Sequence, residues 1–283
     1  MPQIYHVLTP GCVGGVVELV RGGVLSSTGG HPPHWHSQWQ IVAVTRGNGW
    51  VRVKGTEHRT PGGSLFLIPP EVVHSNDVFD HGCDFRSLLI ESSTVEGIAR
   101  ANGLRLERTR IIRAPVVLSE QWARDFDFFH RCLEKKAPSL ELELLLESWI
   151  VRLLSSQTSQ DGETRERTIH PAARRAREYL ADHAERNVSL DELALASGLS
   201  RFELNRQFSS AFGMPPHAWQ IQVRVNRAKD RLRQGQLLCD VAMELGFADQ
   251  AHFSRLFKRS TGYSPGKLRS EFRKNVQDDE RGK

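Results

Sequence analysis

The chain has 283 residues, 39% hydrophobic and 25% charged, which is ordinary for a water-soluble globular protein and enough for two domains. No apolar run approaches membrane-spanning length and no basic-then-apolar signal pattern appears at the N-terminus, so we expect no membrane partner. The four cysteines form no C-x-x-C pair, which argues against a zinc finger or a disulfide framework and favours a reduced, cytoplasmic protein.

The charge is divided unequally along the chain. The net charge is +5, but residues 1–164 hold 16 Lys and Arg against 18 Asp and Glu, whereas residues 165–283 hold 22 against 15. A basic surface attracts the phosphate backbone without sequence preference, although solvated helices are also often rich in Arg. The second half is therefore the candidate partner of double-stranded DNA.

Residues 5 to about 118 are rich in Gly and Pro and contain short runs with strand character. These runs are Gln40–Val44, Trp50–Val53, Ser64–Ile68 and Arg86–Ile90. Turn signals fall between them at Gly47-Asn48-Gly49, Pro61-Gly62-Gly63 and Pro69-Pro70. Short strands at this spacing are typical of a sandwich or barrel, and we assign residues 1–118 to that domain.

The hydrophobic period becomes helical from about residue 119. Apolar residues recur three and four apart at Trp122, Phe126, Phe129 and Leu133. Pro138 breaks this helix and Ser139 can cap another. A wide stripe follows at Leu140, Leu144, Leu145, Ile150, Leu153 and Leu154. We predict a helical pair over 119–156, which either forms a dimer interface or covers the barrel, and a linker over 157–169.

The region 170–272 is predicted to be all-helical. The expected helices are Ala172–Ala184, one opened by the capping box Ser189 to Glu192, Arg201–Phe212 capped by Ser200, Pro216–Arg233, Leu237–Leu245, Asp249–Ser260 and Ser264–Phe272. Residues 273–283 are expected to be a charged tail, disordered over Gln277–Lys283.

This region contains one pattern twice. The first copy reads Ala194-x3-Gly198-Leu199, then Leu204-x-Arg206-x-Phe208-x4-Gly213-x2-Pro216. The second reads Ala242-x3-Gly246-Phe247, then Phe253-x-Arg255-x-Phe257-x4-Gly262-x2-Pro265. A helix, a tight turn at Gly and a second helix form a helix-turn-helix, and two in one chain can enter two successive major grooves. A plain helical bundle is the alternative.

The two second helices must each bury one face and expose the other. Leu204 with Phe208, and Phe253 with Phe257, are four apart and predict the buried faces. The outward residues are then Phe202, Asn205 and Arg206 in the first copy, and Gln250, Ala251, Ser254 and Arg255 in the second. Arg pairs bidentately with guanine, and Asn or Gln with adenine.

With these motifs, residues 170–272 resemble the DNA-binding domain of AraC-type (AraC/XylS family) transcription regulators. The match includes the segment from Val241 to Phe247 and the ending from Phe253 to Pro265. In that family a long helix joins the two units, and the base-contacting positions fall on the seven outward residues. Ala251 offers only an apolar contact. Arg206 and Arg255 are either base readers or groove contacts that hold phosphate or brace the helix.

The first half resembles the cupin-like sensor barrel common in this family. Its two motifs are His34-x-His36-x3-Gln40-x6-Gly47 and Gly63-x5-Pro69-x-Glu71-x2-His74. Metal-binding cupins normally have Glu at the position of Gln40 and Gly at that of Glu71. The resemblance therefore implies a site of His34, His36, Gln40 and His74, which is either a polar effector pocket or a site for a divalent transition metal.

The sequence thus predicts an α+β protein of two domains: a cupin-like β-barrel followed by two helices, then an all-α domain with two helix-turn-helix units. The predicted function is a sequence-specific transcription regulator controlled by a small-molecule effector, with RNA polymerase and a second copy as further partners. The alternative is a metal-dependent cupin enzyme fused to a DNA-binding domain. We expect no catalytic residues, because Gln40 replaces a carboxylate and no second acid/base group stands at a telling spacing. A ligand-independent DNA binder would leave the histidines unexplained.

Overall fold

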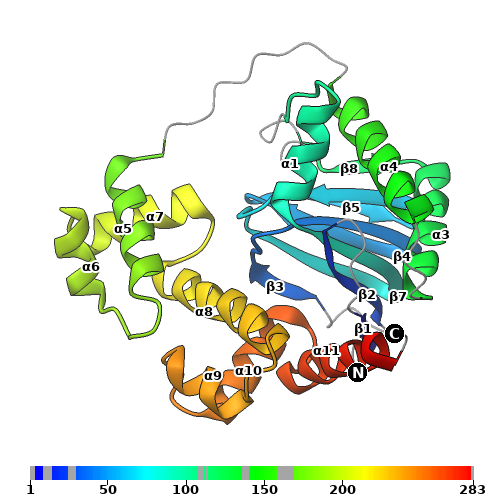
Figure 1. Ribbon diagram of the computed structural model, residues 1–283. Coiled ribbons are helices and arrows are strands. Elements are labelled where there is room, and N and C mark those ends of the chain that lie inside the picture. Colours follow the sequence, from blue (N-terminus) through cyan, green and yellow to red (C-terminus); the bar gives the residue numbers. More distant parts are fainter. Residues whose placement is uncertain are drawn as a thin grey trace. The chain divides into compact units, whose positions relative to one another are not determined.

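The computed structural model describes residues 4–8, 15–24, 30–106, 111, 114–135, 140–158 and 169–281. The chain divides into two compact units. The sheet unit comprises Met1–Gly30, His36–Arg165 and Arg273–Lys283, and the helical unit comprises His31–Trp35 and Glu166–Phe272. Figure 1 shows the sheet with helices beside it in the first unit, and mostly helices in the second. The predicted two-domain α+β class is confirmed.

Eight described strands form one sheet. They are β1 (Ile4–Leu8), β2 (Val16–Val24), β3 (His31–His34), β4 (Trp39–Val53), β5 (Thr56–Pro61), β6 (Ser64–Ile68), β7 (His74–Ile90) and β8 (Val116–Leu118). The order is β1-β2-β7-β4-β6-β8, with β3 beside β7 and β5 beside β4. The long strands β4 and β7 form its centre, in antiparallel register from Trp39 opposite Ile90 to Val53 opposite His74.

The expected turn at Gly47-Asn48-Gly49 is wrong. Strand β4 continues through it with register shifts against β7 between Val44 and Arg46 and between Gly47 and Gly49. Gly47 has a φ of +83°, and a Cβ there would lie 2.0 Å from the carbonyl oxygen of Gly82. The glycine therefore permits a bulge that bends a continuous strand. The turn signals after Pro61 and at Pro69 are confirmed, since they separate β5 from β6 and end β6.

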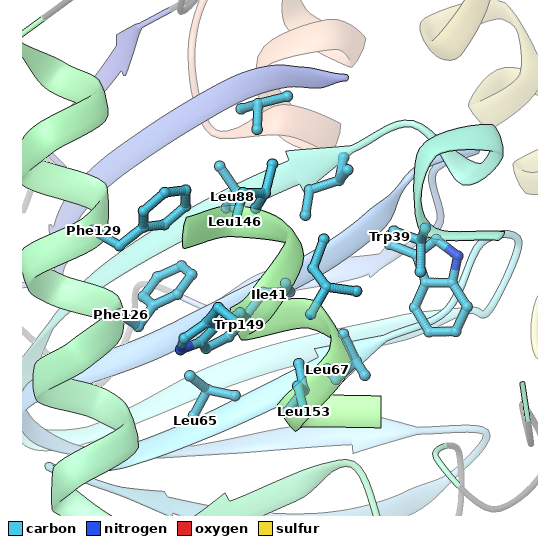
Figure 2. Close-up of a cluster of buried hydrophobic side chains, with 14 of the residues drawn as sticks. Trp39, Ile41, Leu65, Leu67, Leu88, Phe126, Phe129, Leu146, Trp149 and Leu153 are labelled. Carbon is cyan, nitrogen blue, oxygen red and sulfur yellow. The ribbon is translucent and has the colours of Figure 1, made fainter. Parts of the chain in front are cut away.

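The sheet buries side chains on both of its faces. Ile41 and Ala43 of β4 belong to a large cluster that includes the helices α3 (Glu120–Glu134) and α4 (Leu140–Thr158). Figure 2 shows the aromatic and leucine side chains of these helices meeting the sheet. The alternate residues Val42 and Val44 belong to a second cluster on the opposite face. We call this the inner face, and it carries the candidate effector residues.

The helical pair follows the predicted pattern only in part. Ser119 caps α3 by accepting a hydrogen bond from the Trp122 backbone N–H at 3.4 Å. Phe126, Phe129 and Leu133 are buried as expected. Ser139, the predicted cap of α4, lies outside the described residues. In α4 the stripe splits: Ile150, Leu153 and Leu154 are buried, whereas Leu140, Leu144 and Leu145 are exposed. The apolar stripe is wider than the face that the sheet can cover.

The remaining helices follow in chain order. They are α1 (Ser92–Ala101) in the sheet unit, then α5 (Pro171–Asp182), α6 (Leu190–Ser197), α7 (Arg201–Phe212), α8 (Pro216–Arg233), α9 (Leu238–Glu244), α10 (Gln250–Thr261) and α11 (Pro265–Arg281). The predicted caps are present, because the hydroxyls of Ser189 and Ser200 accept the backbone N–H groups of Glu192 and Glu203 at 3.1 and 3.3 Å.

The two helix-turn-helix units have the predicted internal packing. Gly198 and Gly246 adopt positive φ angles of 74° and 71° at the turns. Ala194 and Ala242 are buried between the helices. The two aromatic or leucine pairs of the second helices are fully buried, at Leu204, Phe208, Phe253 and Phe257.

The end of the chain differs from the prediction. We expected a helix ending at Phe272 and then a disordered tail, but α11 runs to Arg281. Residues 273–281 contain neither Gly nor Pro, so no local signal ends the helix before Gly282. Among the described helices, none is both long enough and apolar enough to cross a membrane.

Candidate functional site

The first candidate surface is the outward face of α7. Phe202, Asn205 and Arg206 are all exposed, and Phe202 retains 79% of its accessible surface. Arg206 is held by Glu203, one turn earlier, through two hydrogen bonds of 2.7 and 3.0 Å. These bonds lower the pKa of the Glu203 carboxyl. A recognition helix needs such a projecting polar face, but here the guanidinium already has an acidic partner.

The second candidate surface is the outward face of α10. Gln250, Ala251 and Arg255 are exposed, whereas Ser254 is half-buried. Asp249 caps this helix by accepting the backbone N–H of His252 at 2.6 Å, and that bond lowers the pKa of the carboxyl. Basic residues continue along the helix to its last turn at Lys258 and Arg259. The structure thus brings the predicted residues of each copy onto one helix face.

A buried arginine on α8 links the two reading units, and sequence reasoning missed it. Arg224 is only 4% exposed. Its guanidinium donates to the carbonyl oxygens of Ala184 and Gly246 at 2.6 and 2.7 Å and to Asn187 Oδ1 at 3.0 Å. Burial lowers its pKa from the usual arginine value. Ala184 and Asn187 precede the first unit and Gly246 is the turn of the second, so one side chain bonds to the segment before the first unit and to the second unit.

A close backbone contact joins the same two segments. A Cβ at Gly246 would lie 2.0 Å from the carbonyl oxygen of Glu185, so the turn of the second unit packs directly on the loop before the first. Arg227 adds an ion pair with Glu185 and a 2.7 Å hydrogen bond to Ala181 O. The position of Arg224 between the apolar Val223 and Val225 was the one sequence signal for a buried role. These contacts join the segment that precedes the first unit to the turn of the second.

Three of the four predicted effector residues meet on the inner face of the sheet. The Nε2 atoms of His36 and His74 each lie 3.1 Å from the same end of the Gln40 side-chain amide. The other end of that amide lies 3.0 Å from Ser87 Oγ. The imidazole rings are 5.0 Å apart and nearly perpendicular. Burial lowers the pKa of His74 to about 4, against the opposing effect of its hydrogen bond to Val72.

His34 has different neighbours. Its Nδ1 donates to Pro32 O at 2.9 Å, and its ring lies 5.0 Å from that of His31. Within the residues that the structure describes, no set of three or more His, Cys, Asp or Glu side chains is arranged to hold a metal ion. The cluster has two imidazoles and an amide, without the carboxylate that balances the charge of a metal in most such sites.

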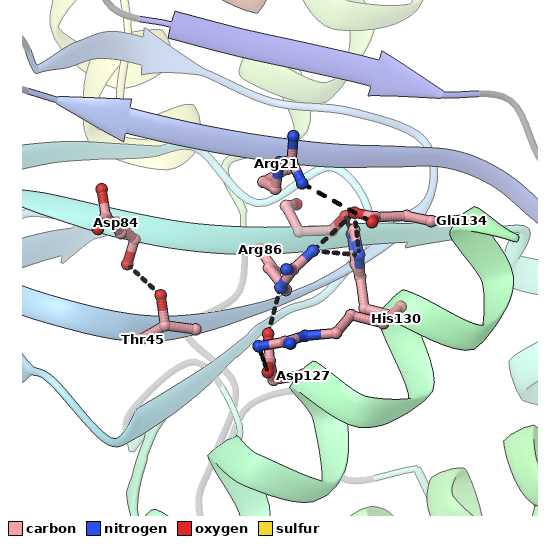
Figure 3. A network of polar contacts seen from close by, with 9 residues as sticks. Arg21, Thr45, Asp84, Arg86, Asp127, His130 and Glu134 are labelled. Atoms are coloured by element: carbon pink, nitrogen blue, oxygen red, sulfur yellow. Dashed lines mark hydrogen bonds and ion pairs between the residues drawn. The ribbon is translucent and has the colours of Figure 1, made fainter.

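A second polar cluster attaches α3 to the outer face of the sheet, and the sequence did not indicate it. Arg86 of β7 forms ion pairs with Asp127 and with Glu134, the latter at 2.6 Å, as Figure 3 shows. His130 is fully buried, accepts from Arg86 Nη1 at 3.2 Å and donates from Nε2 to the Ser87 carbonyl at 3.2 Å. Burial and the charge of Arg86 lower the pKa of His130. Ser87 therefore touches the inner cluster by its hydroxyl and α3 by its backbone.

Two family models match the chain in these two regions. Residues 26–154 match the AraC-like ligand binding domain, and residues 193–271 match a helix-turn-helix domain. The matched ranges include all four candidate effector residues and all seven candidate DNA-reading residues.

Similar proteins match most of the chain. The HTH-type transcriptional regulator YisR of Bacillus subtilis (strain 168) is 24% identical, over 98% of this chain and 100% of its own length. The HTH-type transcriptional activator RhaS of Escherichia coli (strain SE11) is 25% identical, over 84% of this chain and 87% of its own. The structure also resembles the apo form of a ToxT variant from Vibrio cholerae strain SCE256 (TM-score 0.58, 13% identity, 90% of this chain and 97% of that one). Wild-type ToxT with a bound unsaturated fatty acid has a TM-score of 0.54 at 13% identity, covering 94% of each chain. At such identities, the structural likeness shows the fold alone.

Proposed function

The chain belongs to the AraC family of transcription regulators, and from this premise we propose which residues read DNA and which bind the effector. It is a helix-turn-helix DNA-binding regulator with an N-terminal ligand-binding domain. The observation that carries the proposal is the repeat of two recognition helices, each with a buried aromatic or leucine pair and a projecting polar face.

Base reading is assigned to the exposed faces of α7 and α10. Gln250 and Arg255 have donors suited to purine edges in the major groove, and Ala251 can contact a thymine methyl. Phe202 projects from α7 with most of its surface exposed, which supports the same apolar readout in the first unit. Because Glu203 already holds Arg206, we assign Arg206 to groove contact and Arg255 to base reading.

Effector binding is assigned to the inner face of the sheet. His36, Gln40 and His74 supply the polar groups of the site, and the second apolar cluster, which includes Val42, supplies its wall. Such a mixture of apolar walls and few polar groups is usual for small-molecule sites. His34 is the weakest member of the predicted set, because its described hydrogen bond is local. A fatty acid is one effector class to compare, since ToxT has been solved with one bound.

The alternative of a metal-dependent enzyme has less support. The relatives are named as transcription regulators, and the three side chains that meet contain no carboxylate. Metal analysis of the purified protein separates the two functions, since an enzyme of this kind would retain a stoichiometric transition metal.

RNA polymerase and a second copy of the chain are the further partners we propose, in the cytoplasm where promoters are read. The exposed leucines of α4, Leu140 and Leu144, support self-association through that helix. Sedimentation of the wild-type protein against Leu144→Lys tests it. Identical monomeric behaviour of both would remove the dimer from the proposal.

The DNA-reading proposal is tested by selecting bound sequences from a random duplex pool at a stated salt concentration, since phosphate binding alone is salt-sensitive. We expect an enriched site with two short blocks about one helical turn apart. Retention without enrichment, in the presence and absence of cell-extracted small molecules, would contradict sequence-specific reading.

The effector proposal is tested by measuring the affinity for the operator with and without the effector. His36→Ala should retain its affinity for the selected operator and lose the change in affinity that the effector causes, because an effector acts only by binding two states differently. A folded His36→Ala protein with no operator binding would contradict the separation of the two sites.

A further inference from the structure

The two histidines of the inner cluster have their tautomers fixed by the backbone. His36 Nδ1 lies 2.6 Å from Gln38 O, and His74 Nδ1 lies 2.9 Å from Val72 O. A carbonyl oxygen only accepts hydrogen bonds, so both Nδ1 atoms carry a hydrogen. A neutral imidazole has one N–H, and its other nitrogen is then a lone-pair acceptor. Both Nε2 atoms therefore present lone pairs toward Gln40.

Burial disfavours a charge on these rings. His36 and His74 are 5% and 3% exposed, and charging two adjacent imidazoles in an apolar surrounding is costly. The lowered pKa of His74 has the same cause. Around them the inner face is largely apolar, since Ile68 and Leu89 flank Gln40 in the sheet register.

Only one orientation of the Gln40 amide satisfies this arrangement. An amide oxygen facing two unprotonated Nε2 atoms would place three acceptors together, whereas the NH2 group can donate one hydrogen to each ring. The amide oxygen then accepts from the Ser87 hydroxyl at 3.0 Å. Amide oxygen and nitrogen have nearly the same shape, so it is their hydrogen-bond partners that assign them. In this orientation each of these described contacts pairs a donor with an acceptor.

We propose that the Gln40 amide occupies the place of the effector's polar group, and that the effector presents two neighbouring N–H or O–H donors to His36 and His74. The ligand class is a neutral or cationic donor such as a vicinal diol, a carboxamide or an ammonium group, and it excludes a carboxylate. The inference rests on the proposed function, because it assumes that this cluster is the effector site.

The exclusion of a carboxylate follows from lone-pair repulsion. A carboxylate oxygen accepts only, so it would bind here only if both Nε2 atoms gained protons inside a buried site. In addition, Glu18 of β2 is 1% exposed and stands opposite Leu89, the neighbour of Gln40, so this part of the inner face already carries a buried carboxyl group. A fatty-acid headgroup is thus the wrong chemistry for the histidine pair.

The test removes the internal donor and offers soluble replacements to the full-length chain. In Gln40→Ala, propionamide and 1,2-propanediol should raise the melting temperature more than they do for the wild type, and propionate should not. Gln220→Ala is the control variant, because Gln220 is also an amide that donates to fixed protein acceptors, the carbonyls of His183 and Arg186, but it lies in the helical unit. Equal probe effects on both variants, or stabilisation by propionate, would overturn the proposal.

A second measurement needs no variant. Nitrogen NMR of the wild-type protein labelled at histidine should show His36 and His74 protonated at Nδ1 and unprotonated at Nε2 at neutral pH. Protonated Nε2 atoms would overturn the donor assignment even if Gln40→Ala does not fold. If a carboxylate bound at this cluster changes operator binding, the donor class proposed for the effector is refuted and the effector site is kept. Donor probes that bind without any influence on operator affinity would refute the effector site instead.

Discussion

Arg224→Ala should destabilise the helical unit more than any exposed arginine change in it. The guanidinium makes three hydrogen bonds to groups on two different segments, at Ala184, Asn187 and Gly246. Hydrogen bonds to charged groups contribute about 1.5–3 kcal/mol each. Water entering the space left by the side chain would recover part of this, and burying the charge already cost some of it. We therefore expect a net loss of about 3–5 kcal/mol, which is less than the sum of the three bonds.

Hydrogen exchange of the full-length chain measures this loss by region. Amides of α6 to α10 should lose protection in Arg224→Ala, while those of the sheet β4 and β7 should keep it. The matched control is Arg231→Ala on the same helix, whose ion pair with Glu244 also reaches the second unit but is more exposed. An exposed pair of this kind contributes at most about 1 kcal/mol. Equal losses in the two variants would refute the argument that Arg224 joins the units.

The same side chain should set the spacing of the operator. Because Arg224 and the Gly246 contact join the segment before the first unit to the turn of the second, we expect the spacing of the units to be constrained. The wild type should then lose affinity when one base pair is inserted between the two selected blocks. Arg224→Lys retains a charge but not the three-way contact. The affinities of Arg224→Lys for the operator with and without the inserted base pair should differ less than those of the wild type. Its affinity for each block alone should be unchanged. Unchanged discrimination would mean that the backbone contact at Gly246 is sufficient.

Three other changes test the rest of the structure. If Arg255 reads a base, Arg255→Ala should weaken operator binding by about 1–3 kcal/mol, and by more than Arg206→Ala does. An Arg255→Ala protein that binds the operator as tightly as the wild type would contradict the assignment. The pKa of His74 is about 4 when folded, below its ordinary 6.5, so the unfolded chain takes up a proton first and stability falls as pH drops from 6.5 toward 4. Urea denaturation should show that the free energy of unfolding falls by about 3 kcal/mol over this pH range. If the free energy of unfolding of His74→Gln depends on pH as steeply as that of the wild type, His74 is not the origin of the loss. Phe126→Ala should cost about 3–5 kcal/mol by the same method, and a loss below about 1 kcal/mol would mean that α3 is not anchored by this ring.

The sequence predicted most of the helical unit because its signals are local. Glycine at a tight turn, serine at a helix start and paired apolar residues four apart act over a few residues, and each appears at its predicted place in α6, α7, α9 and α10. The outward faces followed at once, since burying Phe253 and Phe257 leaves Gln250 and Arg255 to project. The disordered tail is a wrong prediction because charge alone does not end a helix, and residues 273–281 contain no helix breaker.

The effector cluster was predicted as four residues, and the described hydrogen bonds join His36, Gln40 and His74. Alternation along one strand can place Gln40 on the inner face, but it cannot measure the distance to His74, which comes from another strand 34 residues later. His34 was included because motif spacing treats all its positions alike. The bulge at Gly47 was missed for a related reason: glycine marks a bend, and only its neighbour across the sheet decides whether the strand turns back or continues.

By itself the sequence determined the two-domain organisation, the repeated helix-turn-helix units and the faces that they expose, because these depend on periodicity and on the conformational preferences of single residues. Tertiary structure alone decided that Arg224 joins the two units, that Arg86 and His130 attach α3 to the sheet, and that one amide serves two imidazoles and a hydroxyl. Most of those contacts join segments far apart in the chain, and no local pattern encodes which buried polar groups will find one another after folding.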